Sequence, residues 1–474
     1  MTAIAPPAIG QSPAAPLDAK RQDAPLTEPL ILFLVVASLM TIGILMVYSA
    51  SRTASPGGDT WYFAKHLVFV PVALAAMAFG ASVPYGRLNR RWIAYLVLGS
   101  AVVLLALVLV LGEERNHARR WFSLPLGPLR LSFQPSEYAK FALVIFLAWF
   151  FSRPCAPSGG WLSRLKFLTW YFRRPQGDPC SLLTGFLPPI IVIGIVGVLI
   201  VKEDFGTAAL VGLVAMLLCV VAGWRWWYPL LLIVPGLAGL YRFVWMVDYR
   251  RERLEIWMDP WKYFDGKGWH VCQSLMGIGS GDFFGAGLGA GIQKLYIPEI
   301  TTDFIFAAIC EEMGLLGGLL VIGLFGVLIW RAGRIVSRAP DRFGFLLASG
   351  ILLVIGLQAV LNMGVVTGAL PAKGISLPFI SYGGSCLVMM SFAVGLLISI
   401  SRGRGAASQP QPAAAASGPL VRMVPAGTSP VPVAASAAPT VVTAAVAVPG
   451  AGGSAASAAT PPGGATNKEQ TGHA

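Results

Sequence analysis

Charged residues are scarce in this chain: only 12% of its 474 residues are Asp, Glu, Lys or Arg, whereas 55% are hydrophobic. A soluble domain carries about a quarter of its residues as charges, because its surface faces water. The mean hydropathy of +0.69 agrees with the deficit. The composition therefore excludes an ordinary soluble domain and predicts an integral membrane protein.

Metal-binding and disulfide patterns are also missing. The six cysteines include no CxxC pair, and the four histidines do not stand at a spacing typical of zinc ligands. We therefore expect neither a disulfide framework nor a structural zinc site. The net charge of +13 does not indicate nucleic acid, because Lys and Arg are scattered over short loops between apolar segments. That distribution is typical of membrane orientation.

Long apolar runs are abundant. A helix needs about 20 residues to cross a hydrocarbon layer of roughly 30 Å, and its backbone must be hydrogen-bonded internally there. The sequence predicts an all-α integral membrane protein with about ten transmembrane helices. The predicted spans are 30–50, 66–84, 92–112, 137–152, 183–201, 206–223, 227–246, 303–330, 344–368 and 383–400.

The two ends of the chain have a different composition from the spans. Residues 1–28 are polar and rich in Ala and Pro, and residues 402–474 consist mainly of Ala, Pro, Gly and Ser. Both are predicted to be disordered tails. The membrane domain is 29–401, and it includes a long extracytoplasmic loop, 247–302, before the eighth helix. Long loops in compact proteins are usually functional.

Positive charges predict the orientation. If the N-terminus is cytoplasmic, the short inner loops carry more Lys and Arg than the short outer loops, which places both termini in the cytoplasm. The outer loop 113–136 departs from this rule. It carries Arg115, Arg119, Arg120 and Arg130. These arginines therefore suggest a role other than orientation.

Charges beside apolar spans are candidates for function, because placing one in a membrane costs on the order of 3 kcal/mol by insertion scales. Glu137 and Lys140 are three residues apart, so their opposite charges share one helix face. They either neutralise each other and fix the helix, or Glu137 holds Lys140 for an anionic ligand. Arg119 and Arg120 would add phosphate-binding charge on the outer face.

Asp303 stands at the predicted outer end of the eighth span. It is either a partner of the helix dipole or a general base at the junction of lipid and water. Glu311 and Glu312 lie deeper in the same span and are predicted to be paired in the interior. Asp204 or Thr207 suits the N-cap of the sixth span.

Two glycine-rich segments interrupt the spans. Six glycines in 277–289 follow no predicted strand, so a looped backbone at the membrane surface is favoured over a dinucleotide-binding loop. Segment 370–385 combines Pro and Gly with one cation, Lys373. Irregular backbone at membrane depth must be buried in protein or line a cavity, so this segment is predicted to be a re-entrant loop facing the outer side.

In this order, the motifs resemble the SEDS family of FtsW/RodA-type peptidoglycan glycosyltransferases. The resemblance covers about 30–401, and it is most specific in 46–51, 133–140, 251–260, 273–317 and 370–385. Segment 46–51 and the Lys373-Gly374 pair are more similar to division-type than to elongation-type members. The resemblance implies a ten-helix fold and polymerisation of lipid II with release of undecaprenyl pyrophosphate, during septal cell-wall synthesis.

The resemblance also implies residue roles. The family's essential aspartate falls on Asp303 and its charged helix pair on Glu137 and Lys140. We therefore predict that Asp303 is catalytic, and that the substrate-binding residues are Arg119, Arg120, Glu137, Lys140 and Lys373. The donor is α-linked and the product β-linked, so the reaction inverts configuration and needs one base for the acceptor hydroxyl.

Cofactors and partners follow from the same resemblance. A divalent cation, Mg²⁺ or Mn²⁺, is the one cofactor considered, because Mg²⁺ binds through carboxylates and phosphates. No organic cofactor is expected. The implied partners are a class B penicillin-binding protein transpeptidase and other division proteins, in the cytoplasmic membrane at the division septum.

Other functions stay open at this point. A lipid II flippase would distribute charges through the bilayer and show an inverted repeat. In this chain the charges crowd the outer boundary and no repeat is obvious. A scaffold for division proteins and an elongation-type polymerase are the remaining alternatives, and a division-type polymerase is favoured.

Overall fold

The computed structural model describes most of the membrane domain. The described residues are 27–51, 61–115, 118–126, 129–153, 185–225, 227–232, 234, 236, 241, 248–266, 268–297, 299–371 and 373–403. The predictions for the two tails, and most of the predicted span 227–246, lie outside the described residues.

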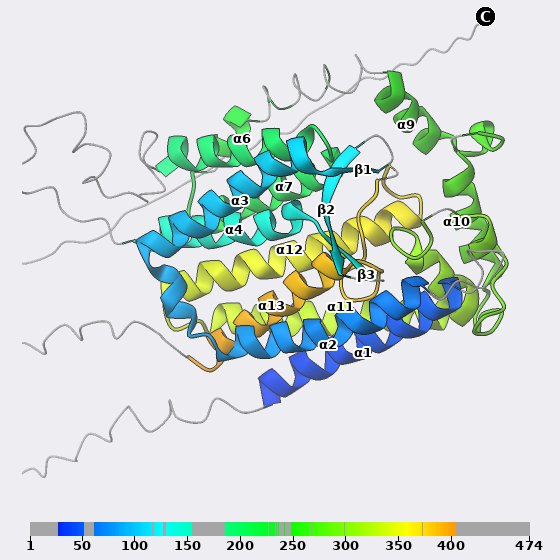
Figure 1. Ribbon diagram of the computed structural model, residues 1–474, viewed down its shortest axis with the longest axis horizontal. Coiled ribbons are helices and arrows are strands. Elements are labelled where there is room, and N and C mark those ends of the chain that lie inside the picture. The colour runs from blue at the N-terminus through cyan, green and yellow to red at the C-terminus, as the bar shows by residue number, and fades with distance from the viewer. Residues whose placement is uncertain are drawn as a thin grey trace, which may run out of the picture. The chain divides into compact units, whose positions relative to one another are not determined.

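Long helices dominate the described chain (Figure 1). They are α1 (Thr27–Ser51), α2 (Trp61–Ser82), α3 (Arg91–Leu111), α4 (Pro135–Phe151), α6 (Leu187–Val201), α7 (Phe205–Val221), α11 (Ile305–Ser337), α12 (Arg342–Val366) and α13 (Gly384–Ser401). Each coincides with one of the predicted spans. Six are long and apolar enough to cross a membrane, and α6 and α7 are shorter apolar helices.

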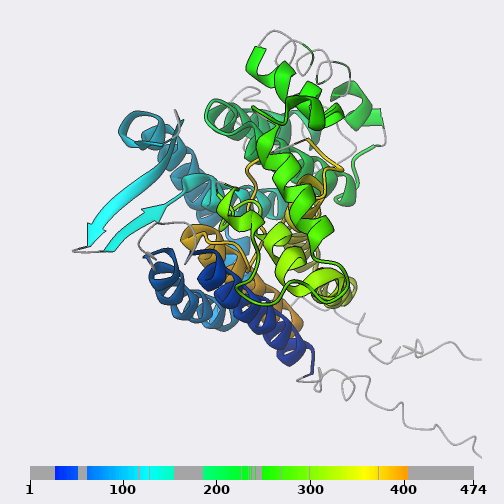
Figure 2. The same cartoon turned by 90° about the vertical axis from the view of Figure 1, so that its right-hand side faces the viewer.

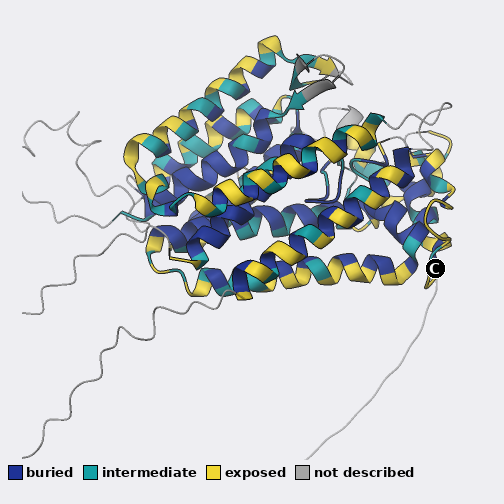
Figure 3. Ribbon diagram, turned by 60° about the horizontal axis from the view of Figure 1, so that its bottom comes forward, coloured by how far each residue is buried: buried dark blue, intermediate teal, exposed yellow. Residues whose placement is uncertain are grey.

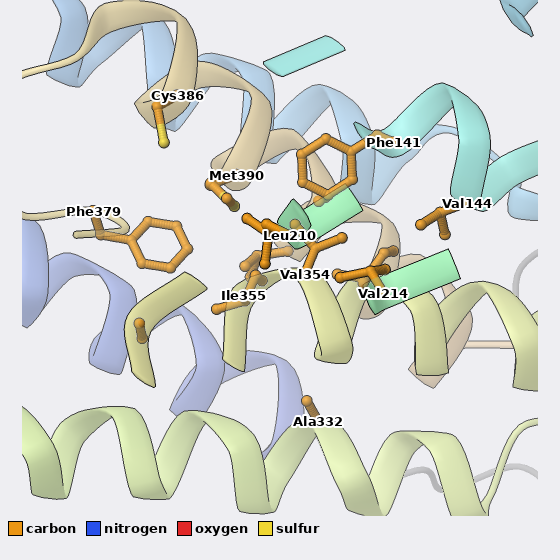
Figure 4. Close-up of a cluster of buried hydrophobic side chains, with 14 of the residues drawn as sticks. Phe141, Val144, Leu210, Val214, Ala332, Val354, Ile355, Phe379, Cys386 and Met390 are labelled. Atoms are coloured by element: carbon orange, nitrogen blue, oxygen red, sulfur yellow. The ribbon is translucent and has the colours of Figure 1, made fainter. Parts of the chain in front are cut away.

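The interior of the bundle forms where α4, α7, α12 and α13 meet. Phe141, Val144, Leu210, Val354 and Met390 contribute to a cluster of buried side chains there (Figure 4). Nearly every residue of α4 is buried, whereas α2 and α3 expose apolar side chains along their length (Figure 3). Exposed apolar side chains on membrane helices face lipid, so α4 is central and α2 and α3 are peripheral.

Helices α2 and α13 pack closely at a pair of glycines. A Cβ atom at Gly80 would lie 2.5 Å from the Phe392 carbonyl oxygen, and one at Gly395 would lie 2.2 Å from the Met77 carbonyl oxygen. A side chain at either position would separate the helices. Small residues at such crossings let membrane helices approach closely, which compensates for the absence of a hydrophobic driving force in lipid.

The segments between the membrane helices contain more regular structure than the sequence predicted. The 247–302 loop holds α9 (Asp248–Met258), η5 (Trp261–Tyr263), α10 (Trp269–Ser280) and η6 (Gln293–Leu295). Between α2 and α3 lies η2 (Tyr85–Asn89). The loop before α4 forms a three-stranded antiparallel sheet of β1 (Glu113–Arg115), β2 (Ala118–Leu126) and β3 (Leu129–Phe133). The chain is therefore not purely helical, although helices form its membrane part.

Helix α11 is interrupted where the glycine-rich loop meets it. Gly314 has φ 67° and ψ −166°, which breaks the helix. The Ala286 and Gly287 amides donate to the Glu311 and Glu312 carbonyl oxygens, at 2.9 and 3.1 Å. The loop thus satisfies carbonyl groups that the break leaves without helical partners. This arrangement agrees with the looped backbone predicted for the glycine-rich segment.

The segment between α12 and α13 is irregular and largely buried. Ile375, Leu377, Phe379 and Ile380 are all buried. A Cβ atom at Gly43 of α1 would lie 2.7 Å from the Ile380 carbonyl oxygen, so α1 packs directly on this backbone. Irregular backbone among membrane helices is covered by protein here, as the re-entrant prediction requires.

Candidate active site

Asp303 occupies a turn immediately before α11. Its backbone amide donates to the Glu299 carbonyl oxygen at 3.1 Å, and its own carbonyl oxygen accepts from Asn362 Nδ2 of α12 at 2.8 Å. Its carboxylate lies against Gly374, where a Cβ atom would be 2.7 Å from Asp303 Oδ2. Main-chain bonds on both sides therefore fix the backbone of this residue, and Gly374 leaves room beside it for the carboxylate.

The environment of Asp303 favours its neutral form. The pKa of Asp303 is raised to about 7 by burial, the largest cause, and by the Glu299 and Asp204 carboxylates, while Arg120 opposes the shift. The residue nevertheless keeps partial exposure. A carboxylate with a pKa near the working pH, with access to solvent, suits a general base.

Arg120 brings positive charge from β2 to the N-terminal end of α7. Its Nη1 lies 3.8 Å from Asp204 Oδ2, and its Nε donates to the Glu203 carbonyl oxygen at 2.7 Å. Arg119 is exposed and lies 3.6 Å from Glu114, measured from its Nη2 to Glu114 Oε2. Of the two predicted arginines, the structure thus brings Arg120 into the electrostatic surroundings of Asp303.

Asp204 has two roles in this arrangement. It caps α7, because its carboxylate accepts from the Thr207 amide at 3.1 Å and from Thr207 Oγ1 at 2.8 Å. Of the two predicted N-cap candidates, Asp204 is therefore the N-cap, and Thr207 is its hydrogen-bond partner. Its charge also reaches Asp303 and Lys373, which the capping pattern in the sequence did not indicate.

Lys373 lies beside the start of α7, next to Asp204. Its Nζ is 4.4 Å from the centre of the Phe205 ring, at the start of α7. Burial lowers the pKa of Lys373, Asp204 opposes that shift, and Arg253 of α9 reinforces it. Arg253 was not predicted as a site residue, because α9 is a charged helix on which one arginine is not distinctive.

Glu137 and Lys140 form a buried pair inside α4. Lys140 Nζ lies 2.8 Å from Glu137 Oε2 and also donates to Gln358 Oε1 of α12 at 2.6 Å. The pair is therefore mutually neutralised, which corresponds to the structural alternative. The substrate-binding role of these residues stays a prediction.

Two amide side chains of α12 connect the buried pair with Asp303. Gln358 Nε2 donates to the Ser376 carbonyl oxygen at 3.0 Å, and Asn362 Nδ2 donates to the Ile375 carbonyl oxygen at 2.6 Å. The sequence analysis missed both residues. Their signal was present: two amides four residues apart in an otherwise apolar span are costly in lipid and indicate partners on one helix face.

The carboxylates deeper in α11 hold the glycine-rich loop. Glu312 Oε1 accepts from Lys294 at 2.6 Å and from Ser49 of α1 at 2.6 Å. Glu311 Oε1 accepts from the Ile292 and Gln293 amides at 2.5 and 2.8 Å. The predicted interior pairing is confirmed for Glu312, whereas the partners of Glu311 are main-chain amides.

A resident metal site does not fit the described residues. Among them, no three His, Cys, Asp or Glu side chains come together as ligands for a metal ion. The carboxylates that influence Asp303 have other partners, since Asp204 binds Thr207 and Glu299 accepts from Thr302 Oγ1 at 3.2 Å. The predicted divalent cation stays a prediction, and no step below depends on it.

The fold and the site define a multi-pass helical membrane protein that holds a carboxylate of raised pKa, with cations nearby, where α7 and α11 begin. The chain belongs to the FtsW/RodA/SpoVE family. The family model, described as "Cell cycle protein", matches residues 29–405.

Known relatives and solved structures agree with this assignment. Stage V sporulation protein E of Bacillus subtilis is 39% identical over 384 residues, covering 79% of this chain and 98% of the relative. A probable peptidoglycan glycosyltransferase FtsW of Coxiella burnetii is 36% identical, covering 77% and 93%. A chain from a solved "peptidoglycan synthase complex" superposes with a TM-score of 0.62 at 28% identity, covering 79% and 97%. The rod shape determining protein RodA of Thermus thermophilus gives 0.54 at 27% identity, covering 79% and 96%.

Proposed function

We propose that this protein is an inverting peptidoglycan glycosyltransferase that polymerises lipid II into glycan strands. The observation that carries the proposal is the position of Asp303, a carboxylate of raised pKa at the outer end of the bundle with Arg120 and Lys373 beside it. Relatives named as probable peptidoglycan glycosyltransferases support it.

The proposal gives each group a task. Asp303 takes the proton from the 4-hydroxyl of the acceptor N-acetylglucosamine, and the resulting oxygen attacks the anomeric carbon of the donor. The bond between that carbon and the pyrophosphate oxygen breaks, so configuration inverts and undecaprenyl pyrophosphate leaves. Arg120 and Lys373 stabilise the negative charge on the departing pyrophosphate.

The buried side of the site keeps the base in place. Asn362 holds the main chain of both Asp303 and Ile375. Gly374, between Lys373 and Ile375, leaves room for the carboxylate. A positioned base gains its effect from a fixed approach to the reacting hydroxyl, so these contacts contribute to rate without touching substrate.

The setting of the reaction is part of the proposal. The protein works in the cytoplasmic membrane at the division septum, with both termini in the cytoplasm. It acts with a class B penicillin-binding protein and other division proteins. A solved neighbour comes from a complex that coordinates polymerisation with crosslinking, which supports a transpeptidase partner. A divalent cation would accompany the pyrophosphate of the substrate, and chelation by EDTA during the assay tests that requirement.

Reconstitution tests the proposed activity. Purified protein in liposomes, with its partner, is given lipid II and assayed for glycan strands, and Asp303→Asn is compared with wild type. Asp282→Asn is a matched control, because Asp282 is an exposed acid of the same outer region. We expect strands from wild type and from the control variant, and none from Asp303→Asn. Movement of lipid II between leaflets without strand formation would instead favour a flippase.

A further inference from the structure

Segment 283–296, which lies between α10 and Asp303 and is described throughout, exposes apolar side chains and hides its charge. Six large side chains are at least half exposed: Phe283, Phe284, Leu288, Ile292, Leu295 and Tyr296. The one charged residue of the segment, Lys294, is buried, and its Nζ lies 2.6 Å from Glu312 Oε1 of α11. A loop in water normally exposes charges and covers phenylalanine, so this segment has the surface of a membrane element.

The segment adjoins the lipid-facing surface of α11. The Leu316 amide donates to the Phe283 carbonyl oxygen at 3.3 Å. Leu315 and Leu316 are about half exposed, as is Leu319 one turn further along, and α11 is long and apolar enough to cross a membrane. Figures 1 and 2 show the green chain that contains α10 at one end of the helix bundle. The exposed phenylalanines thus continue the apolar surface of a membrane helix.

The exposed part of α11 is too short to cross the hydrocarbon layer by itself. Trp330 is exposed and is followed by Arg331 and Arg334, and aromatic and basic residues of this kind mark a membrane boundary. From Leu315 to Trp330 the helix rises about 22 Å, whereas the hydrocarbon layer is roughly 30 Å thick. Before the break in α11, residues 305–312 are all buried. The remaining lipid-facing surface, about 8 Å high, therefore has to come from the segment docked there.

The main chain of segment 283–296 is suited to a place without water. Irregular backbone in lipid needs partners within the protein for its amides. Glu311 Oε1 accepts from the Ile292 and Gln293 amides. Glu312 Oε2 accepts from the Gly289 amide at 3.0 Å. In water these amides would be solvated without help, and two carboxylates inside an apolar helix would bring only their desolvation cost. Both acids are explained if the segment lies where water cannot supply acceptors.

We propose that segment 283–296 is embedded in the membrane leaflet on the Asp303 side, with Phe283, Phe284 and Leu288 among the acyl chains. Acyl chains fit this surface because it is apolar, exposes no charge and continues the lipid-facing side of α11. The chain runs on from Tyr296 to Asp303, so the contact anchors the segment that precedes the candidate base. The lipid contact itself does not depend on the proposed enzymatic activity.

Site-directed nitroxide labelling tests this contact. The full-length protein is placed in nanodiscs of phosphatidylethanolamine and phosphatidylglycerol, with single labels at Phe284→Cys and Leu288→Cys. Leu319→Cys on α11 is the lipid reference, and Asp265→Cys, at an exposed acid of the same long loop, is the water reference. Collision rates with oxygen, which concentrates in lipid, and with a nickel chelate, which stays in water, are measured by electron paramagnetic resonance.

The expected result is a lipid-like reading within the segment. The ratio of oxygen to nickel collisions at positions 284 and 288 should be close to that at 319 and several-fold above that at 265. A ratio equal to that at 265 would show a loop in water and overturn the proposal. Protection of 284 and 288 from both reagents would show that a protein surface, such as a second copy, covers them, and would overturn it equally.

A pair of substitutions at Glu311 tests what holds the segment in the lipid. Glu311→Leu removes the acceptor of the Ile292 and Gln293 amides, so nickel collisions at position 288 should rise several-fold. Glu311→Gln keeps a side-chain oxygen that accepts hydrogen bonds and should leave them unchanged. Unchanged accessibility in Glu311→Leu would refute this role of Glu311. If Glu311→Leu does not fold, the labels in the protein with Glu311 intact still decide the lipid contact.

The labelling uses a background without reactive thiols. The cysteines of the described residues, Cys219, Cys272, Cys310 and Cys386, are buried, and Cys155 and Cys180 are replaced by serine. Glycan synthesis by each labelled protein is assayed separately as a check of folding. The readout is position-specific accessibility, so a protein inactive as a polymerase would still confirm or refute the lipid contact.

Discussion

The pH dependence of polymerisation offers the sharpest test of Asp303. With a pKa of about 7, its carboxylate is about 3% ionised at pH 5.5 and about 90% ionised at pH 8, by the ordinary titration relation. A reaction that needs the ionised base should therefore be about 30-fold faster at pH 8 than at pH 5.5. With the ordinary value of 3.8 for this group, the same interval would change the rate by only about 2%.

Two neighbouring substitutions should move this profile in opposite directions. Glu299→Gln removes a negative charge that raises the pKa of Asp303, so the rising limb should shift to lower pH. Arg120→Gln removes a positive charge that lowers this pKa, so the limb should shift to higher pH. Glu299 is exposed, and its effect should weaken in high salt.

The assay is the initial rate of glycan synthesis from lipid II in proteoliposomes between pH 5 and 9. It is taken as kcat/KM so that the profile reports the free enzyme. Arg120→Gln is also expected to lower the plateau, because Arg120 is assigned to the pyrophosphate, and only the midpoint is used for the comparison. A profile that is flat across this range, or midpoints unchanged in both variants, would refute the reasoning.

Three further predictions use other contacts. Ionisation of Asp303 is disfavoured in the folded protein, so this group lowers the free energy of unfolding as pH rises from 3.8 towards 7. In thermal unfolding in detergent, Asp303→Asn should therefore have a higher Tm than wild type at pH 8 and should lose that advantage at pH 4.5. Lys294→Met leaves Glu312 buried without its cation and should lower the free energy of unfolding by about 3–5 kcal/mol. Adding Glu312→Leu should recover much of the lost Tm, and no recovery would contradict the pairing. Gly374→Ala places a methyl group 2.7 Å from Asp303 Oδ2 and should slow glycan synthesis at least tenfold; Gly323→Ala, with no atom within 4 Å of its added Cβ, should be normal.

The membrane helices could be predicted from the sequence because a single physical requirement decides them. A run of about 20 apolar residues in lipid has few structures other than a helix. The segments between the spans are governed by several weaker preferences, and less of their structure could be predicted. Segment 122–133 alternates apolar residues with polar residues or proline on both sides of Gly127-Pro128, a hairpin pattern, but the arginines around it favoured an interpretation in terms of charge.

The break in α11 depends on contacts distant in sequence. A glycine within an apolar helix is common, and Gly317 and Gly318 stand close to Gly314 without interrupting the helix. Gly314 differs because residues 282–287 dock against it and bond the freed main chain, with the Leu315 amide donating to the Asp282 carbonyl oxygen at 2.8 Å. No local pattern identifies which glycine will receive such a partner.

In the candidate site, too, the residue could be predicted from its type, whereas its environment depends on packing in the folded chain. Asp303 could be selected from the sequence because a carboxylate at the end of an apolar span is costly. Its raised pKa could not, since that shift comes from burial and from Asp204 and Glu299, which approach it only in the folded chain. Asn362 was overlooked for a related reason: an uncharged amide attracts less notice than an acid, although it holds the main chain of Asp303.

The buried Glu137–Lys140 pair is connected with Asp303 through two amide side chains of α12. Lys140 binds Gln358, and Gln358 binds the Ser376 carbonyl oxygen. One turn along α12, Asn362 binds the adjacent Ile375 carbonyl oxygen and that of Asp303. Removing Lys140 would leave Gln358 Oε1 and a buried carboxylate without their donor, at the point where α12 fixes the backbone beside the base. The pair therefore supports, through Gln358, the side of α12 that holds the main chain of Asp303, whether or not Lys140 also meets the substrate.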